Sequence, residues 1–207
     1  MSLARVHNFS VSLDGFGTGE GQSRDAPFGH AGERLHEWMF ATRWWHETIG
    51  RPGGTGGLDD AFARQFTPGI GAEIMGAGKF GHPGWHKDPE WKGWWGPNPP
   101  FHTPTFILTH HPRPSIEMEG GTTFHFLDAS PAKALETARE AADGQDVRIG
   151  GGPTVSAASL PPGSSTTCTS WWSRSCSAEA YASGTDWRAS KRTMRPRPPP
   201  RPAESRM

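Results

Sequence analysis

Cysteine and tyrosine are almost absent from this chain of 207 residues, which has two cysteines and one tyrosine. Cys168 and Cys176 both lie in the last quarter of the chain, and two thiols so close together are weak grounds for a disulfide. The composition therefore excludes a disulfide-rich secreted domain and favours a reducing, cytoplasmic setting.

Long apolar runs and a net charge are also missing. No apolar run approaches the roughly 20 residues that span a bilayer, and the N-terminal stretch MSLARVHNFSVSLDG does not have the pattern of a signal peptide. The formal charge is zero, so charge gives no reason to expect a nucleic acid or a membrane as partner. The two parts of the chain nevertheless differ in charge. Residues 1–155 carry 13 Lys and Arg against 18 Asp and Glu, whereas residues 156–207 carry 8 Lys and Arg against 3 Asp and Glu.

The first 155 residues alternate between strand-like and helix-like patterns. Phe9, Val11 and Leu13 occupy alternate positions before an Asp-Gly turn, which predicts a strand over residues 5–15. Further strands are predicted within 72–81, 103–111, 122–128 and 146–152, and helices over 32–49, within 53–66 and over 130–142. This alternation predicts a largely parallel sheet covered on both faces.

Two of the predicted helices have specific patterns. In residues 130–142, Ser130 is a good N-cap and Pro131 suits the first helical position. In residues 32–49, one helical face is apolar, apart from one threonine; it contains Leu35, Trp38, Met39, Thr42, Trp45 and Ile49. We expect the tryptophans of this segment to lie in the core or in a pocket wall.

Two glycine turns follow predicted strands, Gly76-Ala77-Gly78-Lys79 and Gly150-Gly151-Gly152. In open α/β sheets, ligands bind beyond the carboxyl ends of the strands, and glycine there lets backbone N–H groups approach a phosphate. Lys79 would add a positive charge. The alternative is that both segments are only tight turns, because short glycine motifs are common by chance.

Five segments, in this order, carry a resemblance to a known family: SVSLDG, IMGAGKFG, PTFILTHHPRP, GGTTFHFLD and VRIGGGPTV. Together they resemble the dihydrofolate reductase-like family, and more narrowly the stand-alone relatives of the C-terminal reductase domain of riboflavin-biosynthesis deaminase-reductases. The resemblance covers about residues 5–155. It implies a three-layer αβα fold with a mostly parallel sheet, NADPH as cofactor, a small-molecule substrate and a homodimer in intact relatives.

The resemblance also implies the residues of a cofactor site. These are Gly76, Gly78, Lys79, Thr109, Gly150, Gly151, Gly152 and Thr154. Thr109 corresponds to the family position near the adenosine 2′-phosphate, and Arg113 and Arg148 are nearby candidates for charge pairing. The family usually has an arginine where this chain has Ala77, so one bidentate phosphate contact is lost, which Lys79 replaces only in part.

Catalytic and metal-binding candidates are few. Asp14 ends the first predicted strand, where a carboxylate could orient a substrate amine or relay a proton; the alternative is a turn residue that bonds its own backbone. Neither His82 and His86 nor His110 and His111 have a carboxylate at zinc-ligand spacing, so we expect no metal site. Residues 81–104 are predicted to form a long aromatic loop. Its segment 91–104 either folds over its own aromatic side chains or covers a flat ligand ring.

The chain changes character after Val155. Residues 156–207 have no valine or isoleucine and one leucine, but eleven serines, seven prolines and seven arginines, which is typical of a disordered segment. The Trp-Trp pair, the two cysteines and the tyrosine are unusual in such a segment. A plausible GC-rich coding of residues 164–173, read one base earlier, gives L-I-D-H-L-H-V-V-V-V, the pattern of a core strand.

We therefore hypothesise a shift of reading frame near residues 155–156, which makes 1–155 an incomplete nucleotide-binding domain and 156–207 an out-of-frame, irregular tail. The alternative is a genuine basic Pro/Arg-rich tail that binds acidic partners such as RNA. Without the C-terminal strands of the family, the first strand would be an open edge.

Two functions follow as expectations. The first is an NADPH-dependent reductase of a pterin- or aminopyrimidine-like heterocycle, similar to 5-amino-6-(5-phosphoribosylamino)uracil reductases of riboflavin biosynthesis. The second is a non-catalytic nucleotide-binding relative or an inactive pseudoenzyme. Asp14 favours the first function, and Ala77 favours the second.

Overall fold

A computed structural model describes residues 2–12, 16–151, 155 and 166–172 of the chain. Its strands are β1 (Ala4–Val11), β2 (Ile70–Gly76), β3 (Pro104–Leu108), β4 (Ile116–Glu117), β5 (Thr123–Leu127), β6 (Asp146–Ile149) and β7 (Thr166–Trp172). Its α-helices are α1 (Glu37–Phe40), α2 (Arg43–Thr48), α3 (Leu58–Ala63), α4 (Ala77–Phe80) and α5 (Pro131–Ala141). Short 3-10 helices are η1 (Gly32–Leu35), η2 (Arg64–Phe66), η3 (Trp85–Lys87) and η4 (Glu119–Gly121).

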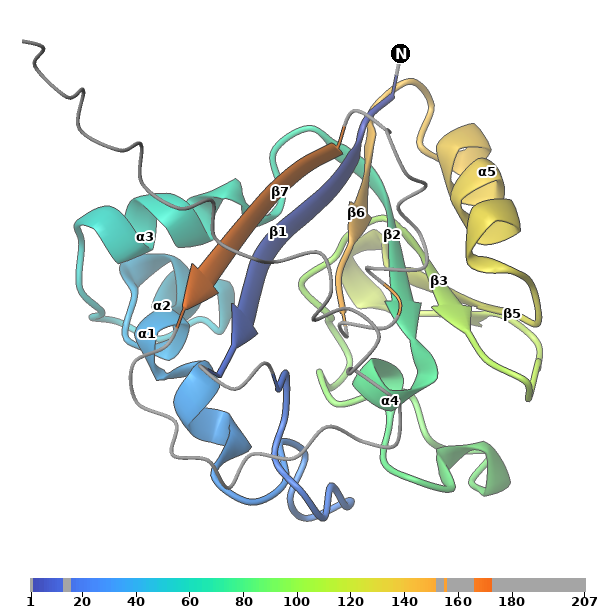
Figure 1. The fold of residues 1–207 in the computed structure, drawn as a ribbon, viewed down its shortest axis with the longest axis horizontal. Helices are drawn as coiled ribbons and strands as arrows, with labels where there is room; N and C mark the ends of the chain where they lie inside the picture. Colours follow the sequence, from blue (N-terminus) through green and yellow to red (C-terminus); the bar gives the residue numbers. More distant parts are fainter. Residues whose placement is uncertain (1, 13–15, 152–154, 156–165, 173–207) are drawn as a thin grey trace, which may run out of the picture.

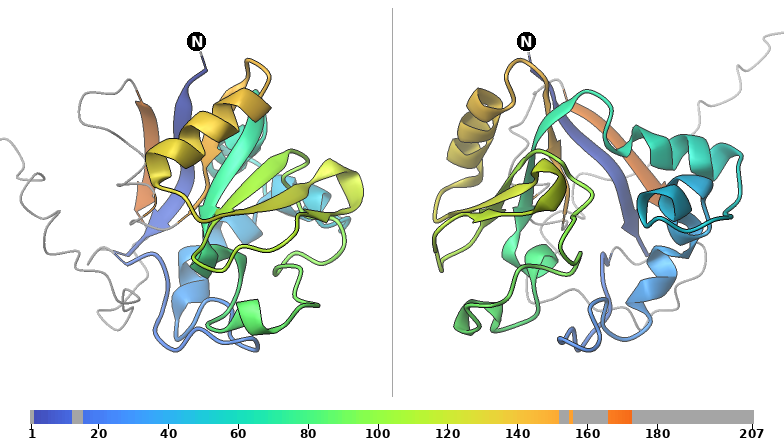
Figure 2. Two further views of the ribbon diagram at one scale, coloured as in Figure 1. Left: turned by 90° about the vertical axis from the view of Figure 1, so that its right-hand side faces the viewer. Right: turned by 180° about the vertical axis from the view of Figure 1, so that it is seen from behind.

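The strands form one sheet in the order β4-β5-β3-β2-β6-β1-β7. All neighbouring pairs are parallel except β4 with β5, which is antiparallel. Helix α5 lies on one face of the sheet, and α1 to α3 lie on the other (Figures 1 and 2). The prediction of an α/β protein with a mostly parallel sheet flanked by helices is therefore confirmed.

Two apolar clusters fill the space on the two faces. Under α5, Ala134, Leu135 and Ala138 pack on apolar side chains of β1, β2, β3 and β6. The other face carries an aromatic cluster made of Trp44, Phe66, Phe80, Trp85, Trp91, Phe101, Phe124 and Phe126, with smaller apolar residues between them. Strand β2 is covered on both faces, which explains why its first six residues are buried.

Helix α5 begins and ends close to the predicted positions. The Ser130 hydroxyl accepts a hydrogen bond from the Lys133 backbone N–H at 3.3 Å, so the predicted N-cap is confirmed. Pro131 occupies the first helical position, where its missing N–H costs nothing.

The prediction of one continuous helix over residues 32–49 is wrong. The segment contains η1, α1 and α2, and the chain changes direction at Thr42. Thr42 is fully buried, its backbone is extended, and its hydroxyl accepts a hydrogen bond from Trp45 N–H as the N-cap of α2. Because the helix ends there, Ile49 leaves the predicted apolar face and is 41% exposed.

Strand β1 differs from its predicted alternation. Its register with β7 shifts between Val6 and Phe9, as in a β-bulge. Val6 is buried in the cluster under α5, whereas after the shift Ser10 is buried and Val11 is only half-buried. Ser10 accepts a hydrogen bond from the indole N–H of Trp38 at 2.9 Å, which ties the end of β1 to α1.

The expectation that β1 is an open edge is wrong, because β7 pairs with it in parallel from Ala4↔Thr166 to Val11↔Trp172. The expectation that residues 156–207 are irregular is also wrong for residues 166–172. This segment is rich in threonine and tryptophan, residue types that are enriched in strands. The rest of the predicted tail lies outside the described residues.

Candidate functional site

The predicted glycine turns meet at the carboxyl edge of neighbouring parallel strands. Ile74 of β2 is paired with Ile149 of β6, and Gly76 of β2 is paired with Leu108 of β3. The segments that follow these strands therefore lie side by side. The structure places six predicted site residues at this edge: Gly76, Gly78, Lys79, Thr109, Gly150 and Gly151. Asp14, Gly152 and Thr154 lie outside the described residues.

The first glycine segment is the start of α4 rather than an open loop. Gly76 has an extended backbone, and helical geometry begins at Ala77. Gly78 is exposed, and a Cβ placed on it would have no heavy atom within 4 Å. Packing therefore does not explain the glycine at position 78, which leaves a free surface beside Lys79.

Lys79 reaches back from α4 to a buried carboxylate on β2. Its Nζ lies 2.9 Å from Oε1 of Glu73. Glu73 is 2% exposed, and its other oxygen accepts a hydrogen bond from Arg148 of β6 at 2.5 Å. The guanidinium of Arg148 lies 3.7 Å from the centre of the Phe66 ring, and Nζ of Lys79 lies 5.4 Å from that of Phe101. The three charged groups therefore lie between the sheet and the aromatic cluster; we call them the Glu73 triad.

The charges of the Glu73 triad do not balance, because two cations share one carboxylate. Burial alone would raise the pKa of Glu73, but Arg148 and Lys79 together hold that pKa below its ordinary value. Burial lowers the pKa of Lys79 to about 8; the charge of Glu73 opposes this shift, and that of Arg148 adds to it. The side chain of Lys79 is 26% exposed, whereas those of Glu73 and Arg148 are 2% and 3% exposed, so Lys79 is the member of the triad that lies nearest to solvent.

The second glycine turn, Gly150–Gly151, lies directly against the Glu73 triad, with no room for a side chain at either position. A Cβ on Gly150 would be 1.9 Å from Oε1 of Glu73 and 2.7 Å from Nζ of Lys79. A Cβ on Gly151 would be 2.5 Å from Cδ of Lys79. Glycine at these two positions therefore has an explanation that involves no ligand: it leaves room for the Lys79–Glu73 ion pair, which packs against the turn.

His36 belongs to the surroundings of Lys79. Its ring is tilted against Phe28, with ring centres 4.6 Å apart, and stacked on Phe40 at 6.0 Å. Burial, with a smaller contribution from the positive charge of Lys79, lowers the pKa of His36 to about 4. The imidazole is therefore neutral at pH 7 and adds no charge to the site.

The other residues proposed for the adenosine end have partners within the protein. Thr109 is 8% exposed, and its hydroxyl accepts a hydrogen bond from the His111 backbone N–H at 3.0 Å. Arg113 donates hydrogen bonds to the backbone carbonyls of Asp88 and Trp91 and lies over the Phe126 ring. Arg113 therefore holds the aromatic loop, and Arg148 holds Glu73, so neither arginine is oriented as a free phosphate ligand.

The aromatic loop contributes to the core. Trp85, Trp91 and Phe101 are 4%, 8% and 4% exposed, and they pack with Phe80 in the aromatic cluster. Trp91 also donates its indole N–H to the carbonyl of Phe80 at 3.2 Å. Of the two alternatives for this loop, the one in which it folds over its own aromatic side chains is confirmed for these residues.

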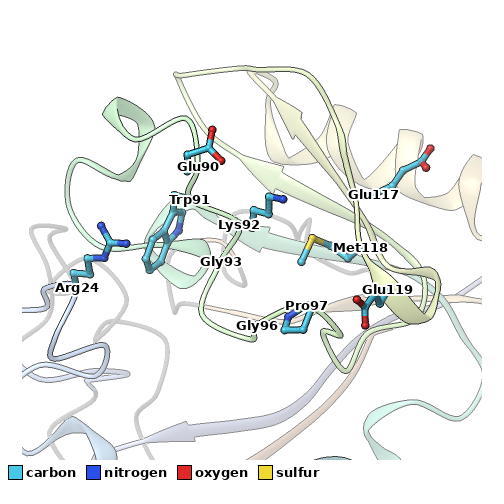
Figure 3. Close-up of a pocket in the computed structure, with 10 residues that line it drawn as sticks. All are labelled: Arg24, Glu90, Trp91, Lys92, Gly93, Gly96, Pro97, Glu117, Met118 and Glu119. Atoms are coloured by element: carbon cyan, nitrogen blue, oxygen red, sulfur yellow. The ribbon is translucent and has the colours of Figure 1, made fainter.

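A hollow of about 460 Å³ lies between this loop and the segment after β4. Its walls are residues 90–93, 96–97 and 117–119, together with Arg24, whose guanidinium lies over the Trp91 ring (Figure 3). None of these residues belongs to the predicted site. The five charged side chains of the lining are all exposed, so the hollow is an open, polar depression.

Sequence reasoning missed Glu73 and the pairing of Arg148 with it. The signal was present, because Glu73 is the one charged residue in the otherwise apolar or glycine run from Ile70 to Gly78. A carboxylate inside a buried strand requires a buried cation. Only the β2–β6 register, which pairs Glu73 with Arg148, identifies that cation.

No protein-family model matches the chain, and no curated protein matches it. Within the described ranges, no helix is long and apolar enough to cross a membrane. In the same part of the chain, no three or more His, Cys, Asp or Glu side chains are grouped so that they could hold a metal ion.

Proposed function

We propose that the chain is a cytoplasmic NADPH-dependent reductase of a small, flat heterocycle, with the three-layer fold of the dihydrofolate reductase-like family. The observation that supports this most is the meeting of the start of α4 and the Gly150–Gly151 turn at one edge of a parallel sheet, with the partly exposed Lys79 side chain between them. Ligands of open α/β sheets bind at such an edge. A dinucleotide carries phosphates that an ammonium attracts.

The residues present fit a dinucleotide in two respects. Gly78 is exposed with open space where a side chain would be, so a phosphate can approach the backbone there. The Glu73 triad has one more positive than negative charge, and Lys79 is its exposed member. NADPH would supply the hydride; in our proposal Lys79 orients the phosphates, and Asp14 relays a proton or orients a substrate amine.

The alternative is a protein that binds a nucleotide without reducing a substrate. Ala77 supports this alternative, because it stands where the family usually has a phosphate-binding arginine. The pairing of Lys79 with Glu73 supports it further, since it reduces the charge left for a ligand.

Calorimetric titration of the full chain with NADPH and NADH tests the proposal. We expect saturable binding of NADPH, weakened about tenfold or more in Lys79→Met, since a charge-assisted phosphate contact is worth roughly 1.5–3 kcal/mol. Lys133→Met is the matched control, because Lys133 is an exposed lysine of α5 that is also paired with a glutamate. No saturable binding at millimolar NADPH would contradict both functions. Binding without NADPH oxidation in the presence of pterins and aminopyrimidines would favour the non-catalytic alternative.

A further inference from the structure

We infer that Glu73 is a positioning residue that holds the ammonium of Lys79 in place over the Gly150–Gly151 turn and thereby keeps it ready for a phosphate of the ligand. This inference rests on the proposed function, because it concerns the same edge of the sheet. Glu73 itself is 2% exposed and acts on a ligand only through Lys79.

The geometry leaves Lys79 few other positions. Oε1 of Glu73 holds its Nζ at 2.9 Å, and the stem of the side chain lies against Gly151, where a Cβ would be 2.5 Å from Cδ. The Phe101 ring lies 5.4 Å from Nζ on the aromatic side. A lysine side chain has many rotamers, so a fixed ammonium binds an anion with a smaller loss of entropy than a free one.

The two cations bound to Glu73 differ in exposure, because the side chain of Arg148 is 3% exposed and that of Lys79 is 26% exposed. The guanidinium of Arg148 donates a hydrogen bond to Oε2 of Glu73 at 2.5 Å. Because Arg148 is 3% exposed, a ligand does not reach it. Its Nε has no hydrogen-bond partner among the described residues. With Arg148 bound to the same carboxylate, Glu73 does not neutralise Lys79 fully, and Lys79, whose side chain is 26% exposed, keeps an attraction for an anion.

The charged and titratable groups described around Lys79 come from three other elements. They are Glu73 of β2, Arg148 of β6 and His36, which lies between η1 and α1 and is neutral above pH 4. Because burial lowers the pKa of Lys79 to about 8, its ammonium loses its proton just above neutral pH. The ligand should therefore bind progressively more weakly as the pH rises above 8.

The experiment measures NADPH affinity from pH 6.5 to 9.5 for the wild type and three variants, Glu73→Gln, Glu73→Asp and Lys79→Arg. In the wild type, we expect the dissociation constant to rise above pH 8 and to level off at the value of Lys79→Met, about tenfold higher or more. Lys79→Arg stays charged in this range, so it should remove the dependence. Glu73→Gln removes the carboxylate that favours the ammonium, so binding should weaken about tenfold near pH 7.5 and recover at lower pH, and Glu73→Asp should restore part of it.

A second measurement needs no ligand. The titration of the Lys79 amine, followed by NMR after reductive ¹³C-methylation, should shift to lower pH in Glu73→Gln and remain unchanged in Glu136→Gln, a matched exposed pair in α5. An unchanged Lys79 titration in Glu73→Gln, or a Lys79→Arg variant as pH-dependent as the wild type, overturns the inference. If Glu73→Gln fails to fold, the pH profile of Lys79→Arg decides. If the wild type binds no NADPH, the proposed function fails, whereas a shifted titration would still establish that Glu73 controls the charge of Lys79.

Discussion

At the scale of single residues, the main feature of this protein is the number of ionisable side chains placed inside it. Glu73 and Arg148 are almost fully buried, and they form an ion pair with each other. Replacing one member of such a pair leaves the other as an unpaired buried charge, which costs about 3–5 kcal/mol, more than the pair itself contributes to stability. We therefore expect single substitutions of Glu73 or Arg148 to destabilise the protein more than replacement of both by apolar residues of similar volume.

His36 should make the stability of the protein depend on acid pH. Its pKa in the folded protein is about 4, below the ordinary value of 6.5, so folding favours the neutral ring. The stability that this provides is present above pH 6.5 and lost as the pH falls towards 4, by up to about 3 kcal/mol. Chemical denaturation at several pH values should show this loss in the wild type and a smaller loss in His36→Gln.

His110→Gln is the control for this prediction, since His110 has a side chain that is 92% exposed. The control variant should follow the wild type at each pH. Equal acid sensitivity in His36→Gln and the wild type would contradict the assignment of this effect to His36.

At the scale of elements, the site is made by the ends of β2 and β6, which come from distant parts of the sequence. Gly150 follows β6, and its N–H donates to the carbonyl of Ile74 in β2 at 2.8 Å. Lys79 then crosses from α4 to the Glu73 carboxylate. Helix α4, strands β2 and β6 and the Gly150–Gly151 turn therefore contact one another at one point. We expect a substitution in any of them to change the packing of the others.

Two alanine substitutions separate packing from ligand approach at these elements. Gly150→Ala puts a Cβ 1.9 Å from Glu73 Oε1 and should destabilise the protein by about 1–3 kcal/mol through overpacking. Gly78→Ala meets no atom within 4 Å and lies inside α4, so it should leave stability unchanged or raise it by up to about 1 kcal/mol. If a phosphate lies against Gly78, the same substitution should weaken NADPH binding.

Melting temperatures and NADPH titrations of both variants check these expectations. A Gly150→Ala protein as stable as the wild type would contradict the tight packing around the Glu73 triad. Unchanged NADPH affinity in Gly78→Ala would show that the ligand does not approach this glycine.

At the scale of the whole molecule, β7 makes β1 an inner strand of the sheet and takes its place as the edge strand. The segment runs beside β1 along its whole length, so the backbone groups of β1 have partners on both sides for at least part of the strand. An uncovered parallel strand would instead invite aggregation. The reading-frame hypothesis stays a prediction, and sequencing of the coding DNA across residue 155 tests it directly.

Hydrogen exchange tests the pairing itself. In the full chain, we expect slow exchange at amides of β1 and of residues 166–172, and a chain that ends at residue 165 should lose protection in β1 and become less soluble. A shortened chain with unchanged β1 protection would contradict the contribution of β7. Slow exchange in both segments of the full chain would mean that the tail pairs with the sheet in solution, and the reading-frame hypothesis would then be abandoned.

The sequence by itself determined the elements whose information is local. The cap at Ser130 and the alternation in Thr123–Leu127 depend on neighbours within a few residues, so pattern was sufficient for them. Other features depend on contacts between distant segments, and only the tertiary structure decided them. Thr42 ends a helix because its hydroxyl caps the next one in a buried corner, and β7 forms because β1 offers a partner. Glu73 becomes part of a site because parallel pairing puts Arg148 beside it, 75 residues further along the chain.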